Sequence, residues 1–144
     1  MPIKLRFSIH PSMNLNFTLL RDNYSIYRLK TDSGIPDQIY DSEFYSITRT
    51  NEELSVVCKH ADIIPGDNIK IDKYWRILRI NGPLDLSLVG ILADVSGLLK
   101  ENKIPIFVIS TFDTDYVLVK NKNINKTLTV LINNGYKILI EEKP

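Results

Sequence analysis

The segment IPIFVISTFDTDYVLVK, residues 104–120, carries the clearest fold signal in this chain of 144 residues. Two almost continuous apolar runs flank a polar stretch, residues 110–115, which contains three hydroxyl side chains and two carboxylates. Continuous apolar runs are typical of strands buried on both faces, and clusters of Ser, Thr and Asp favour turns. The segment therefore predicts two strands joined by a short polar turn.

The sequence on both sides of this segment supplies the elements that complete a βαββαβ order. Residues 75–80 alternate between apolar and polar side chains, as half-buried strands do. Residues 86–102 and 123–134 repeat apolar side chains at helical spacing, and residues 136–142 form a final strand-like run. The order of strand, helix, two strands, helix and strand is the ferredoxin-like arrangement.

Capping residues mark the expected helix ends. Asp85 or Ser87 is the predicted N-cap of the first helix, and Asn123 is the predicted N-cap of the second. Gly135 stands just past the second helix, where glycine commonly adopts the left-handed conformation. Gly90 is expected inside the first helix, where glycine costs up to about 1 kcal/mol relative to alanine, so a close packing or ligand contact is expected there.

The first half of the chain repeats this order in a shortened form. Residues 24–30 match residues 75–81 in their spacing of aromatic, apolar and arginine side chains, and residues 44–59 match residues 107–120. Short segments rich in Pro, Gly and Asp replace the helices. We therefore predict an α+β protein of two ferredoxin-like βαββαβ units with antiparallel sheets, the first unit being degenerate. The predicted organisation is an N-terminal extension or leader at 1–13, a degenerate unit at 14–74 and a second unit at 75–144.

Composition excludes several classes of function. The 18 Lys and Arg residues balance 17 Asp and Glu residues, so the basic surface of a nucleic-acid-binding protein is not expected. Cys58 is the single cysteine, and His10 and His60 are isolated, so neither a disulfide nor a zinc set is predicted. No stretch approaches the ~20 apolar residues of a membrane span. We expect a cytoplasmic protein that is not an enzyme and has no cofactor, metal, nucleic-acid or membrane partner.

Two stretches together resemble a known family. GPLDLSLVGILADVSGLLKENKIPIF, residues 82–107, precedes the STF-x-x-D pattern formed by Ser110, Thr111, Phe112 and Asp115. This combination resembles the ACT domain, in particular small bacterial proteins with two tandem ACT units that are similar to the CASTOR arginine sensors and to the regulatory portion of aspartate kinases. The resemblance implies βαββαβ units that pair edge to edge and bind a small molecule, usually an amino acid, at the interface between units.

The resemblance also implies a set of ligand-binding residues, which come from the loop and start of the first helix and from the polar turn. By position they are Asp85, Leu86, Ser87, Leu88, Gly90, Leu92, Thr111, Phe112 and Asp115. One position departs from the arginine sensors, because Leu88 stands where those proteins have an acidic residue that helps to hold the ligand. Arginine specificity therefore does not follow.

The chemistry of these residues suits an amino acid. A helix N-terminus offers unpaired N–H groups to a carboxylate, and Asp115 offers a partner for an ammonium or guanidinium group. Thr111 can form a hydrogen bond, and Phe112 can cover apolar surface or stack on a cation. Asp113 is interpreted as a turn residue, and Ser87 as equally an N-cap or a ligand contact.

Two function classes remain open at this point. The first is an amino-acid sensor that acts as a homodimer and regulates an unidentified protein. The second is a ligand-free assembly module, in which an edge strand such as residues 105–109 pairs with its mate in another chain. Stabilisation of the protein by an amino acid distinguishes the two.

Overall fold

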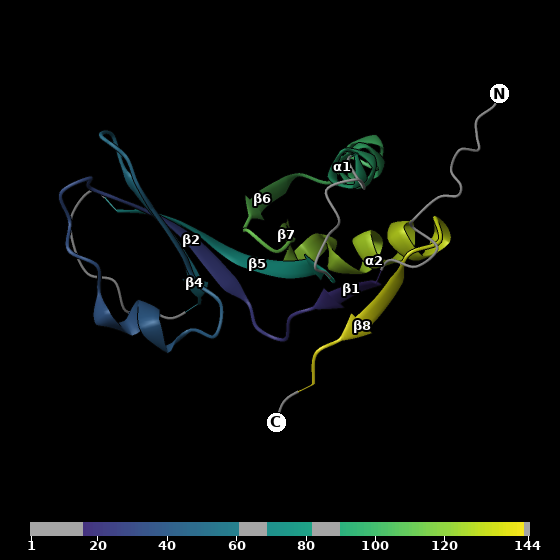
Figure 1. Cartoon of the computed structure of the whole chain (residues 1–144), viewed down its shortest axis with the longest axis horizontal. Helices are drawn as coiled ribbons and strands as arrows, with labels where there is room; N and C mark the ends of the chain where they lie inside the picture. Colours follow the sequence, from purple (N-terminus) through teal and green to yellow (C-terminus); the bar gives the residue numbers. More distant parts are fainter. Residues whose placement is uncertain (1–15, 61–68, 82–89, 143–144) are drawn as a thin grey trace. The chain divides into compact units, whose positions relative to one another are not determined.

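The computed structural model of this protein describes residues 16–60, 69–81 and 90–142 (Figure 1). The chain divides into two compact units. Unit 2 is the continuous segment Asp22–Trp75, and unit 1 consists of Met1–Arg21 and Arg76–Pro144. Strand β5 (Lys70–Ile80) runs from one unit into the other, because the boundary falls between Trp75 and Arg76.

Unit 1 is a mixed α+β unit whose sheet has the strand order β6-β7-β5-β1-β8. Strands β6 and β7 are antiparallel, as are β1 and β5, whereas β1 and β8 are parallel. The elements are β1 (Asn16–Leu19), the end of β5, α1 (Ile91–Glu101), β6 (Ile106–Ser110), β7 (Asp115–Lys120), the 3-10 turn η4 (Asn121–Asn123), α2 (Ile124–Asn133) and β8 (Lys137–Ile140). From β5 onward the order is the predicted βαββαβ.

Helices α1 and α2 pack on one face of this sheet. Val95 and Leu99 of α1 and Leu131 of α2 share a core with apolar strand residues such as Phe17 and Val117. This confirms the predicted apolar stripe of the first helix, because its buried side chains, Ile91, Val95 and Leu99, recur every four residues. The opposite face of the sheet carries the alternate side chains of each strand.

Strand β1 is an addition to the expected pattern. The division predicted from the sequence assigns residues 16–19 to the degenerate unit, 14–74. In the structure these residues instead lie between β5 and β8, in the sheet of unit 1. Phe17 pairs with Ile80 on one side and with Ile138 on the other, so its side chain enters the core beneath the helices. A four-residue strand gives little local signal, and only pairing with distant strands fixes its place.

The first helix begins later than predicted. Helix α1 starts at Ile91, so neither Asp85 nor Ser87 is its N-cap, and Gly90 precedes the helix instead of lying inside it. Gly90 has a φ of 94°, in the left-handed region that glycine adopts without strain. Among the described residues, apart from the chain neighbours of Gly90, none places an atom within 4 Å of where a Cβ would stand, so the backbone conformation is the observed reason for glycine here.

The second helix ends as predicted. Gly135, with a φ of 92°, follows α2, and the N–H groups of Gly135 and Tyr136 donate to the carbonyls of Ile132 and Leu131, each at 3.1 Å. This pair of bonds is the Schellman motif, which satisfies carbonyls that the helix leaves unpaired. Asn123 occupies the N-cap position, but its side chain makes no capping hydrogen bond.

Unit 2 is an antiparallel sheet with little helix. Its strand order is β3-β4-β2-β5, where β2 is Tyr24–Leu29, β3 is Ser46–Arg49 and β4 is Leu54–Lys59. The 3-10 helix η3 (Asp37–Asp41) stands where a full helix would be, and its Ile39 packs into a core with Tyr27 and Leu54. In the part of unit 2 that the structure describes there is no α-helix, as expected for a degenerate unit.

Candidate ligand-binding site

The polar turn between β6 and β7 is held by its own threonines. Ser110 pairs with Asp115, and the N–H of Thr111 donates to the carbonyl of Thr114 at 2.8 Å. The Thr111 hydroxyl donates to the same carbonyl at 3.1 Å and accepts from the Thr114 N–H at 3.3 Å. Thr111 thus closes a four-residue turn with Phe112 and Asp113 at its tip, and its hydroxyl has a structural role.

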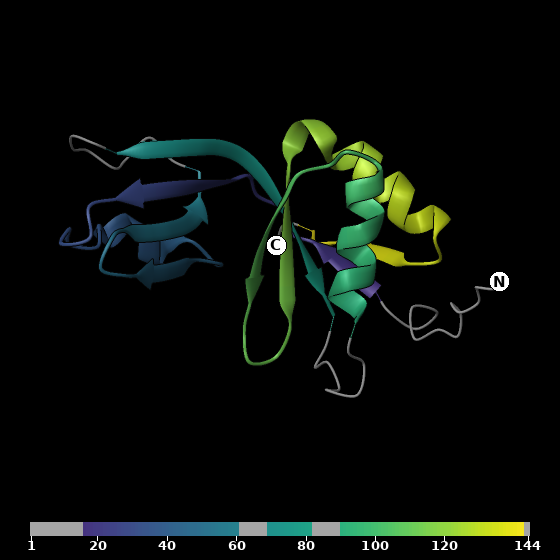
Figure 2. The same ribbon diagram turned by 90° about the horizontal axis from the view of Figure 1, so that it is seen from above.

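The end of β5 supports this turn. The Thr114 hydroxyl is buried and donates to the carbonyl of Ile80 at 2.5 Å, where β5 ends. The chain that leaves β5 leads to α1, and Figure 2 shows the turn and the start of α1 at the same end of unit 1. The structure therefore brings Gly90 and Leu92 to the same end as Thr111, Phe112 and Asp115. The predicted loop residues Asp85, Leu86, Ser87 and Leu88 lie outside the described residues.

The two carboxylates of the turn serve different faces of the sheet. Asp115 precedes Val117 and Val119 by even steps, and these valines pack against the helices, so strand alternation places Asp115 on the helix side. Asp113 instead lines a pocket on the helix-free face. Phe112 is fully exposed at the tip of the turn, and Leu92 packs partly against the core.

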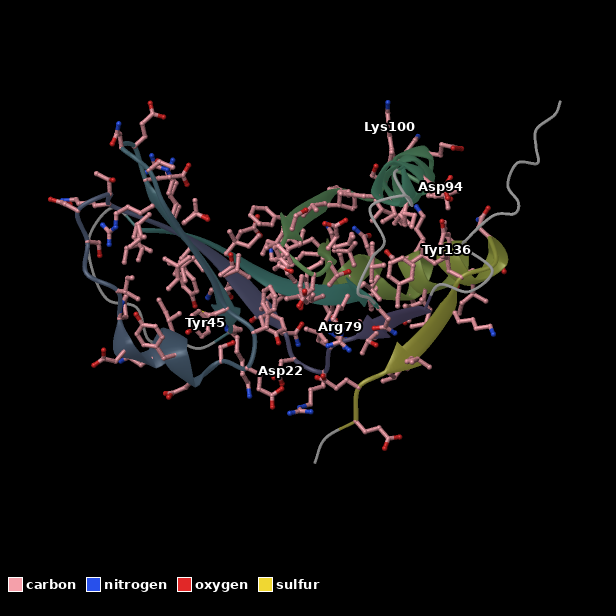
Figure 3. The ribbon with its side chains drawn as sticks, viewed as in Figure 1. Asp22, Tyr45, Arg79, Asp94, Lys100 and Tyr136 are labelled. Atoms are coloured by element: carbon pink, nitrogen blue, oxygen red, sulfur yellow. The ribbon has the colours of Figure 1, made fainter. Side chains whose placement is uncertain are left out.

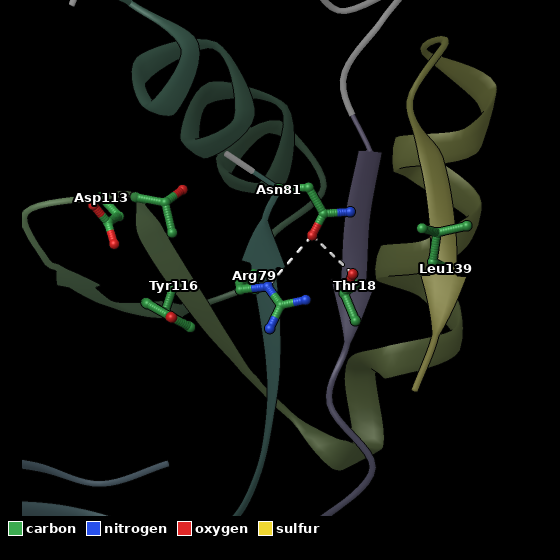
Figure 4. A pocket seen from close by; sticks show the side chains of 7 residues that line it. Thr18, Arg79, Asn81, Asp113, Tyr116 and Leu139 are labelled. Atoms are coloured by element: carbon green, nitrogen blue, oxygen red, sulfur yellow. Dashed lines mark hydrogen bonds between the residues drawn. The ribbon is translucent and has the colours of Figure 1, made fainter. Parts of the chain in front are cut away.

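That pocket was not anticipated from the sequence. It has a volume of about 580 Å³ and is lined by Thr18, Arg79, Asn81, Asp113, Thr114, Tyr116 and Leu139, all in unit 1 (Figure 4). Its residues come from four strands, from Asn81 just after β5 and from the turn, and none belongs to the predicted ligand set. The alternation of Arg79 with Leu78 and Ile80 signalled a side chain outside the core, but only the strand order shows what it faces.

A partly buried hydrogen bond connects α1 to the chain that enters β8. The Tyr136 hydroxyl donates to Oδ2 of Asp94, in the first turn of α1, at 2.5 Å (Figure 3). Burial of the Tyr136 ring and the neighbouring carboxylate of Asp94 raise the pKa of this hydroxyl. Tyr136 therefore stays protonated and ties the start of α1 to the chain that enters β8.

Unit 2 contains a turn with the same frame, between β3 and β4. The N–H of Thr50 donates to the carbonyl of Glu53 at 2.8 Å, and the Thr50 hydroxyl accepts from the N–H groups of Glu52 and Glu53, each at 3.1 Å. Thr50 thus corresponds to Thr111. The internal match between these two stretches, predicted from the sequence, extends to their hydrogen bonds.

The surroundings of the unit 2 turn differ. Arg49, at the place of Ser110, donates to the backbone carbonyls of Thr31 and Ser33, the latter at 2.8 Å. The Thr31 hydroxyl donates in return to the carbonyl of Thr50. The loop after β2 and the turn are therefore joined by the chain's own side chains.

Three further observations on the described residues concern metal binding, membrane spanning and cysteine reactivity. No group of three or more His, Cys, Asp or Glu side chains among them is arranged to hold a metal ion. No helix in the same ranges is long and apolar enough to cross a membrane. Burial raises the pKa of the Cys58 thiol to about 11, so this side chain is a poor nucleophile at neutral pH.

Family models match both parts of the chain. A model of the ACT domain matches residues 70–133, and a model of an N-terminal domain matches residues 22–67. The second match falls inside unit 2.

Solved structures with the same fold include a protein from Agobacterium tumefaciens, which is 37% identical, with 90% of this chain and 95% of that chain covered and a TM-score of 0.80. A protein from Vibrio cholerae, described as a possible transport protein, is 17% identical, with 86% and 92% covered and a TM-score of 0.64. A putative C-terminal regulatory domain of aspartate kinase from Porphyromonas gingivalis is 17% identical, with 83% and 94% covered and a TM-score of 0.52. The last two likenesses concern the fold alone.

Proposed function

This chain belongs to the ACT-domain family, and from that premise we propose that it is a cytoplasmic, non-catalytic regulatory protein that binds an amino acid at the turn end of unit 1. Several structural neighbours are regulatory regions of aspartate kinases. The observation that carries the proposal is that two elements lie at one end of the sheet, the hydrogen-bonded turn 111–114 and the start of α1 (Figure 2).

We assign the roles as follows. The carboxylate of the ligand binds the loop and the start of α1, that is Asp85, Leu86, Ser87, Leu88, Gly90 and Leu92. Gly90 allows the left-handed backbone that precedes the helix. Asp115, on the helix side of the turn, binds the ammonium group. Phe112, fully exposed, covers the ligand or a neighbouring surface.

The second wall of this site comes from another ACT unit, in this chain or in the second chain of a homodimer. We take the organisation 14–74 and 75–144 to represent two ACT units, with β1 contributed to the second. In this proposal the ACT units can pack in two arrangements. Ligand binding favours one of them, and the regulated protein binds the two arrangements differently.

A thermal-shift screen of the whole protein against the twenty amino acids tests this proposal. A ligand at ~100 times its dissociation constant adds roughly 2.7 kcal/mol to stability, which raises the melting temperature by several degrees. Asp115→Ala should lower the rise, whereas Asp32→Ala, which removes an exposed carboxylate of unit 2, should leave it unchanged. An unchanged rise in Asp115→Ala would remove the site assignment.

One observation favours the assembly module as a second candidate. Strand β6 lies at an edge of the unit 1 sheet, and Ile106, Phe107, Val108 and Ile109 are only partly buried. An apolar edge strand is a template for pairing with another chain. Light scattering of the parent protein and of Val108→Lys measures whether β6 pairs between chains. A parent dimer that the lysine converts to a monomer supports pairing at β6, and a monomeric parent rules this pairing out.

A further inference from the structure

Arg79 stands in the middle of the helix-free face of unit 1. Strand pairing places it directly opposite Thr18, and Thr18 is opposite Leu139 on the next strand. Figure 4 shows Arg79 between Thr18 and Tyr116, which comes from β7 on the other side. The guanidinium group is therefore carried by a central strand of a hydrogen-bonded sheet, where its position is fixed more firmly than it would be on a loop.

Asn81 holds one edge of this guanidinium group. The Asn81 side-chain oxygen accepts from the Thr18 hydroxyl at 2.8 Å and from Nε of Arg79 at 3.4 Å. Across the ranges that the structure describes, the two terminal nitrogens of Arg79 have neither a hydrogen bond nor an ion pair, although the residue is partly buried. These nitrogens present two parallel N–H donors, the geometry that binds a carboxylate through both of its oxygens.

A negative charge lines the same pocket. Asp113 faces it from the turn, and among the described residues its carboxylate forms no ion pair with Arg79 or with another cation. Two opposite charges that share a pocket without pairing fit a molecule that carries both charges. The Tyr116 ring, on the strand next to Arg79, and the Leu139 side chain, two strands away on the other side, offer apolar surface in the pocket. Its volume of about 580 Å³ lies within the range of small-molecule sites.

We propose that this pocket, the Arg79 pocket, is a second binding site, for a small zwitterion with an apolar body. Its carboxylate binds the terminal nitrogens of Arg79, and its ammonium group lies toward Asp113. The proposal does not rest on the proposed function, because Asp115 and the start of α1 belong to the helix side of the turn and the Arg79 pocket to the opposite face.

The pocket can be tested on the unmodified whole chain by NMR. L-leucine is the zwitterionic probe, leucinamide lacks the carboxylate, and 4-methylpentanoate lacks the ammonium group. L-leucine should shift the backbone amide signals of Thr18, Arg79 and Asn81 in a saturable way. Leucinamide should bind about ten- to a hundredfold more weakly, because charge-assisted bonds to Arg79 are lost. The loss with 4-methylpentanoate should be smaller, about two- to fivefold, because Asp113 is exposed.

Variants locate the effect. Arg79→Gln should weaken L-leucine binding about ten- to a hundredfold, and Asp113→Asn about two- to fivefold. Arg28→Gln, which removes the same charge from an exposed position on β2, is the control and should bind like the parent. The leucinamide comparison keeps the test decisive if Arg79→Gln unfolds.

Several results would overturn the second site. They are the absence of saturable shifts at Thr18, Arg79 and Asn81 with millimolar L-leucine, equal binding of leucinamide and L-leucine, and full binding by a folded Arg79→Gln variant. Shifts confined to Gly90 and residues 111–115 would overturn it too, while supporting the proposed function. Shifts at the Arg79 pocket that persist in Asp115→Ala would support the second site alone.

Discussion

The turns at residues 50–53 and 111–114 share one hydrogen-bonded frame but have different neighbours. In both, a threonine closes the turn through its backbone N–H and its hydroxyl. In unit 2, Arg49 connects the turn to the loop after β2, whereas in unit 1 the corresponding residue is Ser110, which lacks such reach. The same backbone frame thus occurs with two kinds of neighbour: a side chain that joins the turn to a loop in unit 2, and a short side chain that leaves the turn without this connection in unit 1.

Two α-helices cover the sheet of unit 1, whereas the described part of unit 2 contains no α-helix. The prediction with the largest expected change in stability tests the packing of α1. Leu99 of α1 is completely buried, so Leu99→Ala should lower the free energy of unfolding by about 2–5 kcal/mol. Leu98→Ala is the matched control, because the neighbouring Leu98 is only partly buried and should cost less than half as much. Urea denaturation measures both, and equal costs would contradict the packing of α1 described above.

Each unit also buries a group that resists deprotonation, Tyr136 in unit 1 and Cys58 in unit 2. The folded-state pKa of Cys58 is raised to about 11, so its contribution to stability is complete below the unfolded pKa and is lost as pH rises toward 11. We expect about 2–3 kcal/mol to disappear over that interval. Cys58→Ala should make the decline of unfolding free energy between pH 9 and 11 shallower by this amount. An identical decline would contradict the burial of the thiol.

Arg49→Ser gives the unit 2 turn the residue found in unit 1. Loss of the hydrogen bonds to Thr31 and Ser33 should cost roughly 1–2 kcal/mol, measured by chemical denaturation. Arg28→Ser removes an arginine that donates one exposed hydrogen bond, to the Glu52 carbonyl at 3.2 Å, and should cost less. If the two variants were equally stable, Arg49 would not be the connection between turn and loop.

The smallest expected effect compares the two threonines. Thr50 accepts two N–H groups and Thr111 accepts one. Thr50→Val should therefore cost about 1 kcal/mol and Thr111→Val less, since each removes an acceptor from a polar turn. Thermal denaturation of the two variants in parallel measures the difference. A larger loss of stability in Thr111→Val than in Thr50→Val would contradict the roles given to the two hydroxyl groups.

The repeated order and the helix and strand types could be predicted from the sequence because they depend on local periodicity. The almost continuous apolar run that includes Val117 and Val119 and the helical spacing of Val95 and Leu99 are examples. Gly135 likewise carries a local signal, since a left-handed residue after a helix favours glycine.

Features that depend on distant pairing were missed. The place of β1 between β5 and β8 follows from hydrogen bonds to residues far along the chain. The Arg79 pocket exists only because those strands bring Thr18, Arg79 and Leu139 into one row. The apolar spacing continues before Ile91 and therefore predicts Gly90 inside the helix, whereas its left-handed φ places Gly90 just before the first residue of α1.

We propose that an amino acid binds at the turn end of unit 1 and not at the corresponding turn of unit 2. An NMR titration with the amino acid that gives the largest thermal shift tests this directly. We expect saturable changes at the amides of Gly90 and residues 111–115, with residues 50–53 unchanged. Changes at residues 50–53, or none at residues 111–115 while the ligand binds, would contradict it.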